Sequence, residues 1–424
     1  MDYNSKNTRN SSLSKLEPTR PSMIARRSFL LGAAISVSFL ATKSAFADNS
    51  FLRWVASFRK TALANGISAA TFDLAFKGVT SPDPDVLKKA AYQPEFNEDS
   101  WSYFDNRINE ETIAQGRAEA KRWSRWLSKI QNQYGVDPSI LLAIWSMETN
   151  YGAVMLRDDI MKDAIRSLAT LAYADKRRAK YGRQQLIAAL KILQNGDIKR
   201  SQLSGSWAGA MGHTQFIPTS YIAYAVDVDG DRRRDIWNSI PDALASSANL
   251  LKKNGWQTGR TWGYEVILPQ TSGKFPAGSL SLAQWEKLGF KRANGKAFPY
   301  PNTPATLKLP QGRNGPVFLV TKNFFVLKRY NNADKYALAV GILADEISGY
   351  GGLVNDWARP FTPVSSKERK EIQSHLARMG FYRGNIDGKV GSETIKAIQA
   401  FQKRVGLNVN GHPSREVLLA LRKQ

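Results

Sequence analysis

The 424-residue chain has no cysteine and only three histidines. Without cysteine there is no disulfide framework, no thiol catalysis and no zinc–thiolate site. His213, His375 and His412 are scattered along the sequence, which argues against a histidine metal cluster and against a Ser-His-Asp triad. The chain also lacks a recognised nucleic-acid-binding motif, so we expect no nucleic-acid partner.

Acidic residues are few beside basic ones, with 36 Asp and Glu against 60 Lys and Arg and a formal net charge of +24. Such a charge favours polyanions, among them nucleic acid, anionic membranes and carboxylate-bearing wall polymers. The basic excess is spread along the chain, however, and its simplest interpretation is a solvated, soluble surface. The length allows two or three domains and a sizeable core.

Residues 1–47 are predicted to be an export signal rather than part of the fold. Paired Arg26 and Arg27 precede an apolar run that reaches Ala41, and residues 45–47 (Ala-Phe-Ala) form a small-x-small cleavage site. The paired arginines resemble a twin-arginine signal, and an ordinary secretory signal is the alternative. The apolar run is too short to be a comfortable membrane span, and no cysteine follows it for lipid attachment. We therefore expect a periplasmic protein without a membrane span, starting at either Met1 or Met23.

The most informative segment is a helix that is expected to end in a glutamate. Asp137 is a good N-cap, Pro138 suits the first helical position, and an apolar run follows at residues 140–145. Gly152 can close the helix. The sequence therefore predicts a helix from Pro138 towards Gly152, with Glu148 near its C-terminus.

Glu148 shares one helix face with Leu141 and Trp145, because the three fall at i, i+4 and i+7. Its carboxyl therefore lies among apolar groups near the negative end of the helix dipole, and both effects raise its pKa. A carboxylic acid that stays protonated near neutral pH is what general-acid cleavage of a glycosidic bond needs. The simpler alternative is a surface glutamate in a last helical turn.

A second segment, Gly-Ser-Trp-Ala-Gly-Ala-Met-Gly-His-Thr-Gln-Phe-Ile-Pro-Thr-Ser-Tyr at residues 205–221, is dense in small residues. Small residues let backbone approach a bulky ligand, while the Ser206 hydroxyl and Gln215 amide can bind sugar substituents. Together with Met-Glu-Thr-Asn-Tyr-Gly at residues 147–152, this segment resembles the lytic murein transglycosylases of the B type, lysozyme-like enzymes that cleave bacterial peptidoglycan. The resemblance covers about residues 50–355. It implies an α+β, mostly helical lysozyme-like domain with a small strand patch, at residues 48–350.

The resemblance also implies a sugar-binding groove. Aromatic side chains suit sugar faces and Asn suits acetamido groups, although ordinary core packing is the alternative, above all for Tyr336. One departure is Leu250, where the family often has Tyr, so that one groove contact is missing. The residues that match groove positions by local context are Tyr103, Tyr181, Ser206, Gln215, Phe216, Tyr330, Asn331 and Tyr336.

An acidic loop at residues 227–238 matches the aspartate positions of an EF-hand calcium loop. Arg232 stands where the sharp turn needs Gly, Asn238 stands where a bidentate Glu is expected, and Arg234 occupies a hydrophobic slot. The family carries a metal loop here, so we expect weak binding of a structural Ca²⁺; the alternative is a solvated acidic turn. The predicted metal-site residues are Asp227, Asp229, Asp231, Arg233, Asp235 and Asp242.

Hydrophobic periodicity and turn signals predict the remaining elements of this domain. Helices are predicted at residues 51–64, 67–76, 110–134, 178–194, 240–254 and 334–347. Strands are predicted at residues 263–268, 305–309, 317–321 and 324–328.

Residues 366–424 are expected to form a separate domain after a linker at residues 351–365. The turns Asp387-Gly388 and Asn410-Gly411 each precede a helix N-terminus, so the segment contains the same turn–helix pattern twice. With Phe401, it resembles the small three-helix peptidoglycan-binding domain. That resemblance implies binding to peptidoglycan glycan strands.

The expected reaction uses Glu148 as a single general acid and base, because no second acid lies in a comparable motif, whereas ordinary glycosidases use two. It would cleave the β-1,4 bond between N-acetylmuramic acid and N-acetylglucosamine and leave a 1,6-anhydromuramic acid end, with no cofactor. A hydrolytic muramidase and a non-catalytic wall-binding protein are the alternatives. The sequence does not identify partners among the proteins of wall synthesis or division.

Overall fold

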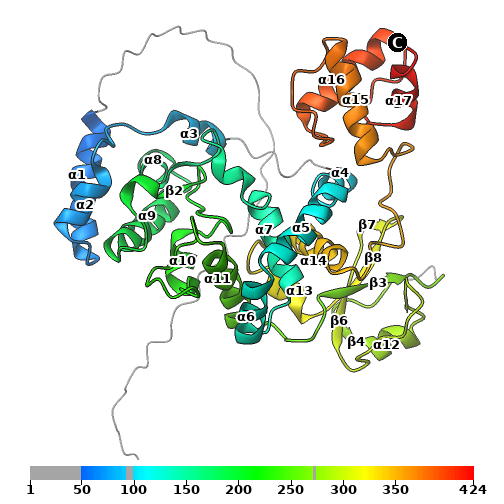
Figure 1. The fold of residues 1–424 in the computed structure, drawn as a ribbon, viewed down its shortest axis with the longest axis horizontal. Coiled ribbons are helices and arrows are strands. Elements are labelled where there is room, and N and C mark those ends of the chain that lie inside the picture. Colours follow the sequence, from blue (N-terminus) through cyan, green and yellow to red (C-terminus); the bar gives the residue numbers. More distant parts are fainter. Residues whose placement is uncertain (1–48, 92–98, 271–273) are drawn as a thin grey trace, which may run out of the picture. The chain divides into compact units, whose positions relative to one another are not determined.

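The computed structural model describes residues 49–91, 99–270 and 274–424. The predicted export signal at residues 1–47 lies outside the described residues. Within the described part of the chain, no helix is both long enough and apolar enough to cross a membrane. Figure 1 shows a mainly helical chain, with short strands in its middle part and further helices near the C-terminus.

Several helices in the first 350 residues begin at residues that cap their N-termini. Ser68, Asp163 and Ser239 each accept a hydrogen bond from a backbone N–H in the first turn of the helix that follows, and Asn109 forms a full capping box with Thr112. These helices are α1 (Asn49–Ala64), α2 (Ala69–Phe76), α3 (Pro84–Ala91), α4 (Ser100–Asp105), α5 (Glu110–Arg122), α6 (Ser124–Tyr134), α7 (Pro138–Thr149), α8 (Ala164–Ala174), α9 (Ala179–Gln194), α10 (Pro218–Tyr224), α11 (Ile240–Lys253), α12 (Leu282–Lys287), α13 (Lys322–Leu327) and α14 (Asp334–Ser348).

Helix α7 lies at the centre of the helical part, where it packs against α5, α6, α11 and α14. Every residue from Ile140 to Ser146 is buried, which fits a helix that is apolar on all sides. The helix ends at Asn150, which takes a left-handed conformation with φ 50°, and not at Gly152 as the sequence indicated. Tyr151 and Gly152 are also left-handed, so the chain turns sharply directly after Glu148.

The strand patch is a five-stranded antiparallel sheet in the order β4-β6-β8-β3-β5, and α12 lies beside β4 (Figure 1). Its own core contains Trp285 and Phe290, and the Trp285 indole donates to the carbonyl oxygen of Ala305 at 2.9 Å. The strands are β3 (Gly263–Ile267), β4 (Ser279–Ser281), β5 (Lys291–Arg292), β6 (Pro304–Lys308) and β8 (Val317–Val320); β7 (Pro310–Arg313) follows β6.

A separate two-stranded pairing connects β1 (Lys162–Asp163) with β2 (Ser204–Gly205), in antiparallel register. It fixes the start of the small-residue segment beside the chain that leaves the glutamate helix. Further on, isolated bridges join Met211 to Gly205 and to Phe216, so the segment folds back on itself.

Two of the sequence-based elements are wrong. The predicted helix at residues 110–134 is two helices, because Trp123 leaves the helical conformation (φ −101°, ψ 13°) and a new helix starts at Ser124. The predicted strand at residues 324–328 is α13. A short apolar run fits a buried strand and a buried helix equally well. The buried Asn323 amide donates to the carbonyl oxygens of Gln257 and Arg260, a distant contact that the local pattern does not contain.

The C-terminal helices α15 (Ser366–Arg378), α16 (Ser392–Val405) and α17 (Arg415–Leu421) enclose a small core of their own. A buried glutamine stabilises each of the two similar turns. Gln373 accepts from the N–H of Gly388 at 2.7 Å, and Gln402 accepts from the N–H of Gly411 at 2.9 Å. The two turns that are similar in sequence are therefore also similar in their hydrogen bonding.

The C-terminal helices also touch the end of α4. The Asn106 side chain and the backbone of Val390 exchange two hydrogen bonds, at 2.8 and 3.3 Å. Asp105 pairs with Arg359, which precedes α15, at 2.7 Å.

Candidate active site

Glu148 lies in the last turn of α7 and is enclosed by protein, although part of its side chain remains accessible. The phenol of Tyr336, on α14, donates a hydrogen bond of 2.6 Å to Oε1 of Glu148. The contact joins residues 188 positions apart and depends on the packing of α7 against α14.

Burial is the main influence on Glu148. It raises the pKa of the carboxyl from 4.5 to about 7, while the hydrogen bond from Tyr336 acts in the opposite direction. Among the described residues, no second carboxylate contributes to this shift. The result is a lone acid that is partly protonated at neutral pH, as general acid–base catalysis requires.

Tyr330 and Tyr336 stack behind the carboxyl, with ring centroids 6.4 Å apart and an angle of 16° between the rings. The Tyr330 hydroxyl donates to the carbonyl oxygen of Thr214 at 2.9 Å and lies 2.9 Å from the hydroxyl of Ser247. Burial raises the pKa of both tyrosines well above 10, so both remain neutral hydrogen-bond donors. The acid is therefore fixed by a neutral network.

Ser206 and Tyr181 meet at one turn of the small-residue segment. The Ser206 hydroxyl oxygen accepts the backbone N–H groups of Ala208 and Ala210, at 3.3 and 3.1 Å. The Tyr181 hydroxyl donates to the carbonyl oxygen of Ala208 at 2.9 Å. Because the acceptor positions of Ser206 are used internally, its hydroxyl proton is left to donate to a ligand.

Gln215 has a left-handed backbone (φ 51°), and its amide donates to the carbonyl oxygen of Gly212 at 2.9 Å. Gly212 is also left-handed, and a Cβ there would lie 2.5 Å from the carbonyl oxygen of Ile236. This glycine is therefore required for close packing of the chain on itself, a reason that the sequence analysis did not consider.

The remaining groove candidates differ in exposure. Phe216 is buried and packs edge-on against Tyr330 with ring centroids 5.7 Å apart, so it supports one ring of the tyrosine stack. Tyr103, on α4, lies 3.8 Å below the guanidinium of Arg107. Asn331 is exposed on the loop before α14, and the side chain of Leu250 is buried in the core.

The sequence analysis missed His213. Its Nδ1 accepts a hydrogen bond from Trp145 Nε1 at 3.2 Å, and the imidazole fills the space beside Gly152, where a Cβ would lie 2.7 Å from the ring. Burial lowers the pKa of His213 to about 4, so the ring is neutral. The only signal in the sequence was its place in the small-residue segment, which does not reveal a contact with a helix more than 60 residues earlier.

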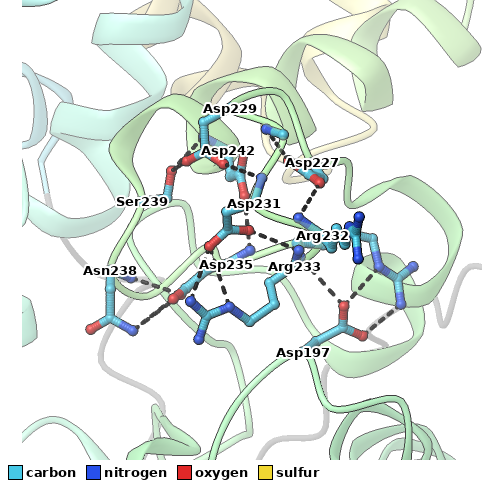
Figure 2. A network of polar contacts seen from close by, with 12 residues as sticks. Asp197, Asp227, Asp229, Asp231, Arg232, Arg233, Asp235, Asn238, Ser239 and Asp242 are labelled. Atoms are coloured by element: carbon cyan, nitrogen blue, oxygen red, sulfur yellow. Dashed lines mark hydrogen bonds and ion pairs between the residues drawn. The ribbon is translucent and has the colours of Figure 1, made fainter.

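Figure 2 shows the acidic loop between α10 and α11. One carboxylate oxygen from each of Asp227, Asp229, Asp231 and Asp242 lies within 4.8 Å of the others. Asp242 is fully buried in the first turn of α11, and burial, reinforced by Asp229, raises its pKa to about 6. Ca²⁺ takes about six to eight oxygen ligands, and the four converging carboxylates fit part of such a set.

Two residues of the predicted metal set lie outside that cluster. Asp235 accepts the backbone N–H groups of Trp237 and Asn238, at 3.0 and 2.9 Å, and so stabilises the turn. The guanidinium of Arg233 pairs with Asp231 at 3.1 Å. Arg232 takes φ 70° at the position where the EF-hand pattern has Gly, so the sharp turn forms without it.

Comparison with known proteins agrees with this geometry. Residues 50–345 match the transglycosylase SLT domain family, and residues 365–421 match the peptidoglycan binding domain family. The chain belongs to the transglycosylase SLT family. It is an enzyme of the lytic transglycosylase class, with a mostly helical lysozyme-like fold, as the sequence analysis predicted.

Three relatives illustrate the similarity. SltB3 from Pseudomonas aeruginosa, crystallised with NAG-anhNAM-pentapeptide, is 44% identical with a TM-score of 0.69, and the match covers 88% of this chain and 100% of that one. Membrane-bound lytic murein transglycosylase B of Escherichia coli is 30% identical over 233 residues, which are 53% of this chain and 62% of that protein. Lytic transglycosylase Slt35 from Escherichia coli, in complex with calcium, is 26% identical with a TM-score of 0.58 over 71% of this chain and 93% of that one.

Proposed function

We propose that Glu148 is the single general acid and base of a lytic transglycosylase that cleaves peptidoglycan between N-acetylmuramic acid and N-acetylglucosamine. The observation that carries the proposal is a lone carboxyl that accepts a hydrogen bond from Tyr336 and whose pKa burial raises to about 7. An acid of this kind can give up a proton and take one back within one reaction at neutral pH.

In the first step, protonated Glu148 gives its proton to the bridging oxygen as the bond from C1 of the muramic sugar breaks. Because Tyr336 donates to Oε1, the transferable proton is on Oε2. The hydrogen bond also stabilises the carboxylate that forms. The cationic sugar is stabilised by its own acetamido group, since no second carboxylate perturbs Glu148 among the described residues.

In the second step, Glu148 accepts the proton of the sugar's own 6-hydroxyl, whose oxygen then closes on C1. The products are a 1,6-anhydro ring and a free N-acetylglucosamine 4-hydroxyl, and no water is consumed. Intramolecular attack is favoured by its high effective concentration. The relative SltB3 was crystallised with an anhydro sugar, which supports this outcome over hydrolysis.

Mass spectrometry of digested sacculi tests the proposal directly. We expect muropeptides that are lighter by one water than the hydrolytic products and that lack a reducing end. A hydrolytic muramidase would give reducing ends instead. If the protein only binds the wall, no soluble muropeptides will appear.

We assign the contacts with the sugar substrate to the predicted groove residues. Ser206 donates its hydroxyl proton to the substrate, Gln215 and Asn331 bind acetamido groups, and Tyr103 and Tyr181 lie against sugar faces. Phe216, Tyr330 and Tyr336 act mainly by positioning Glu148, because all three are packed behind it.

Three further assignments belong to the same proposal. Asp227, Asp229, Asp231 and Asp242 hold a structural calcium ion, which is supported by their convergence and by the calcium complex of Slt35. Residues 1–47 direct export to the periplasm. Residues 366–424 form a wall-binding domain joined by the linker at residues 351–365, which is supported by their separate core.

A further inference from the structure

A second cavity, of about 750 Å³, opens at the other end of the glutamate helix. Asp137 and Pro138, where α7 begins, form part of its lining, together with Asp345 near the end of α14. Glu148 lies ten residues further along α7, or about 15 Å along its axis. None of the groove residues lines this cavity, so it is distinct from the candidate active site.

One wall of the cavity is cationic and aromatic. The guanidinium of Arg260 lies 3.5 Å from the ring centre of Tyr300, and that of Arg292 lies 4.9 Å from the ring centre of Tyr264. Arg292 donates to the carbonyl oxygen of Ala297 at 3.0 Å. Nη1 of Arg260, in contrast, is buried without a hydrogen-bond partner. A buried, unpaired guanidinium nitrogen is costly, and the Arg260 side chain as a whole is only partly buried, so its guanidinium can pair with an anion in the cavity.

Two acids, Asp345 and Asp137, also line the cavity. The hydrogen bonds that Asp345 and Asp137 accept come from neutral groups, Trp262 Nε1 at 3.0 Å and Gln131 Nε2 at 3.4 Å. Burial raises the pKa of both carboxyls, that of Asp345 to about 7; Glu346 and Asp137 add to the effect on Asp345 and Arg292 opposes it. A cation bound between the two acids would relieve this unfavourable burial.

Glu265 and the exposed Lys296 also line the cavity, and the carboxylate of Glu265 is already occupied. That carboxylate accepts the backbone N–H groups of Val354 and Asn355, at 2.7 and 2.9 Å. The charged groups that remain for a ligand are therefore the cations Arg260, Arg292 and Lys296 and the acids Asp345 and Asp137. A polyanion is disfavoured by the acids, and a neutral sugar leaves both charges uncompensated.

We propose that this cavity binds a zwitterionic amino-acid group, with the carboxylate at Arg260, the ammonium at Asp345 and Asp137, and the intervening chain over Tyr300. Two sources share this chemistry: the peptide part of the wall polymer and a free amino acid. The inference does not rest on the mechanism proposed for Glu148, because binding is measured without cleavage.

Isothermal titration calorimetry with the tripeptide Lys-D-Ala-D-Ala tests the site on the full chain. We expect Arg260→Gln and Asp345→Asn each to weaken binding about tenfold or more, the effect of losing one charge-assisted hydrogen bond. The matched controls Arg329→Gln and Asp356→Asn remove the same charges at exposed positions outside the lining and should bind like the wild type. Unchanged melting temperatures will show that the variants are folded.

Modified tripeptides separate the two ends of the ligand. The C-terminal amide should bind more weakly and lose its sensitivity to Arg260→Gln, and the peptide acetylated at both its α- and ε-amines should lose its sensitivity to Asp345→Asn. Tighter binding of the tripeptide than of D-alanine assigns the site to wall peptides, and equal binding assigns it to free amino acids. No binding at millimolar tripeptide, or equal binding by wild type and Arg260→Gln, overturns the proposal.

Discussion

The hydroxyl of Thr149 donates a hydrogen bond of 2.6 Å to the carbonyl oxygen of His213. The backbone N–H of His213 in turn donates to the carbonyl oxygen of Ile236, within the acidic loop, at 2.9 Å. The helix that carries Glu148 is therefore connected to that loop through a single residue. Changes in the order of the loop should reach the catalytic end of α7 by this route.

Thr149→Val should destabilise the protein by about 1–3 kcal/mol, because it removes the donor to the His213 carbonyl oxygen and the acceptor of the buried Gly152 N–H while it preserves the side-chain volume. Urea denaturation measures the loss. The exposed Thr80→Val is the matched control and should change stability by less than about 0.5 kcal/mol. Equal effects of the two substitutions would mean that the contact contributes nothing.

Calcium should raise the melting temperature of the mature protein, and chelation should lower it. Binding to the native state alone stabilises by about 1.4 kcal/mol when free calcium is ten times Kd. Asp227→Ala should abolish the shift, because Asp227 is one of the four converging acids, whereas the exposed Asp356→Ala should retain it. An unchanged melting curve at millimolar calcium would identify the loop as an acidic turn only.

Glu148→Gln should abolish lysis of sacculi, since the amide keeps the shape but cannot act as an acid. Removal of a general acid–base group costs at least about 10²–10⁴-fold in rate. Circular dichroism and wall binding should be unchanged. Near-native turnover by this variant would remove Glu148 from the mechanism.

The same substitution has a pH-dependent effect on stability. The carboxyl has a pKa of 4.5 when unfolded and about 7 when folded, so folding favours its protonated form. That contribution is complete below pH 4.5 and is lost as the pH rises through 7, at a cost of at most about 3 kcal/mol, because groove water reaches the carboxyl. Glu148→Gln should therefore become more stable relative to wild type between pH 5 and pH 8. Parallel melting temperatures of the two proteins over this range would contradict the raised pKa.

Tyr336→Phe should shift the pH profile of kcat/KM. The Tyr336 hydroxyl lowers the pKa of Glu148, so its removal lets that pKa rise, and the alkaline limb of the profile moves to higher pH. The exposed Tyr350→Phe should leave the limb in place. A fall in rate without a shift would mean that Tyr336 acts only on substrate binding.

The sequence predicted the elements with strong local signals. The α7 helix was predicted from Asp137, Pro138 and its apolar run, and α16 and α17 each follow one of the two similar turns. The strand predicted at residues 324–328 failed because the buried Asn323 fixes that run through contacts with residues more than 60 positions earlier. Local periodicity carries no information about such contacts.

For the candidate site, too, the sequence identified residues but not the contacts between them. Glu148 and Tyr336 were both named, but their hydrogen bond depends on helix packing between residues 188 positions apart. His213 and the cavity beside Asp345 were missed, because a lone histidine and a lone aspartate have no distinctive pattern around them. The residue types indicate which chemistry a site can perform, whereas the hydrogen-bond partners of each side chain are set by the tertiary fold.

Removal of residues 364–424 should leave a folded, active enzyme that binds sacculi less well. The segment has its own core, so it is expected to fold independently, and tethering raises the effective concentration of the catalytic part at the polymer. The loss should therefore appear at low enzyme concentration on insoluble wall, while short soluble chains are cut about equally by both forms.

The contacts at the end of α4 offer a second variant with which to test the domain boundary. Asn106, which bonds to Val390, follows Tyr103 by three residues, so the C-terminal helices have a path to the groove. Asn106→Ala in the full chain removes the hydrogen bonds to Val390 but keeps the wall-binding helices, which Arg369 and Lys370 also join to Asp105 and Glu111. If truncation and Asn106→Ala both reduce cutting of soluble chains, the C-terminal segment is part of the catalytic fold and the domain boundary is wrong. If neither does, the segment acts as a tether alone.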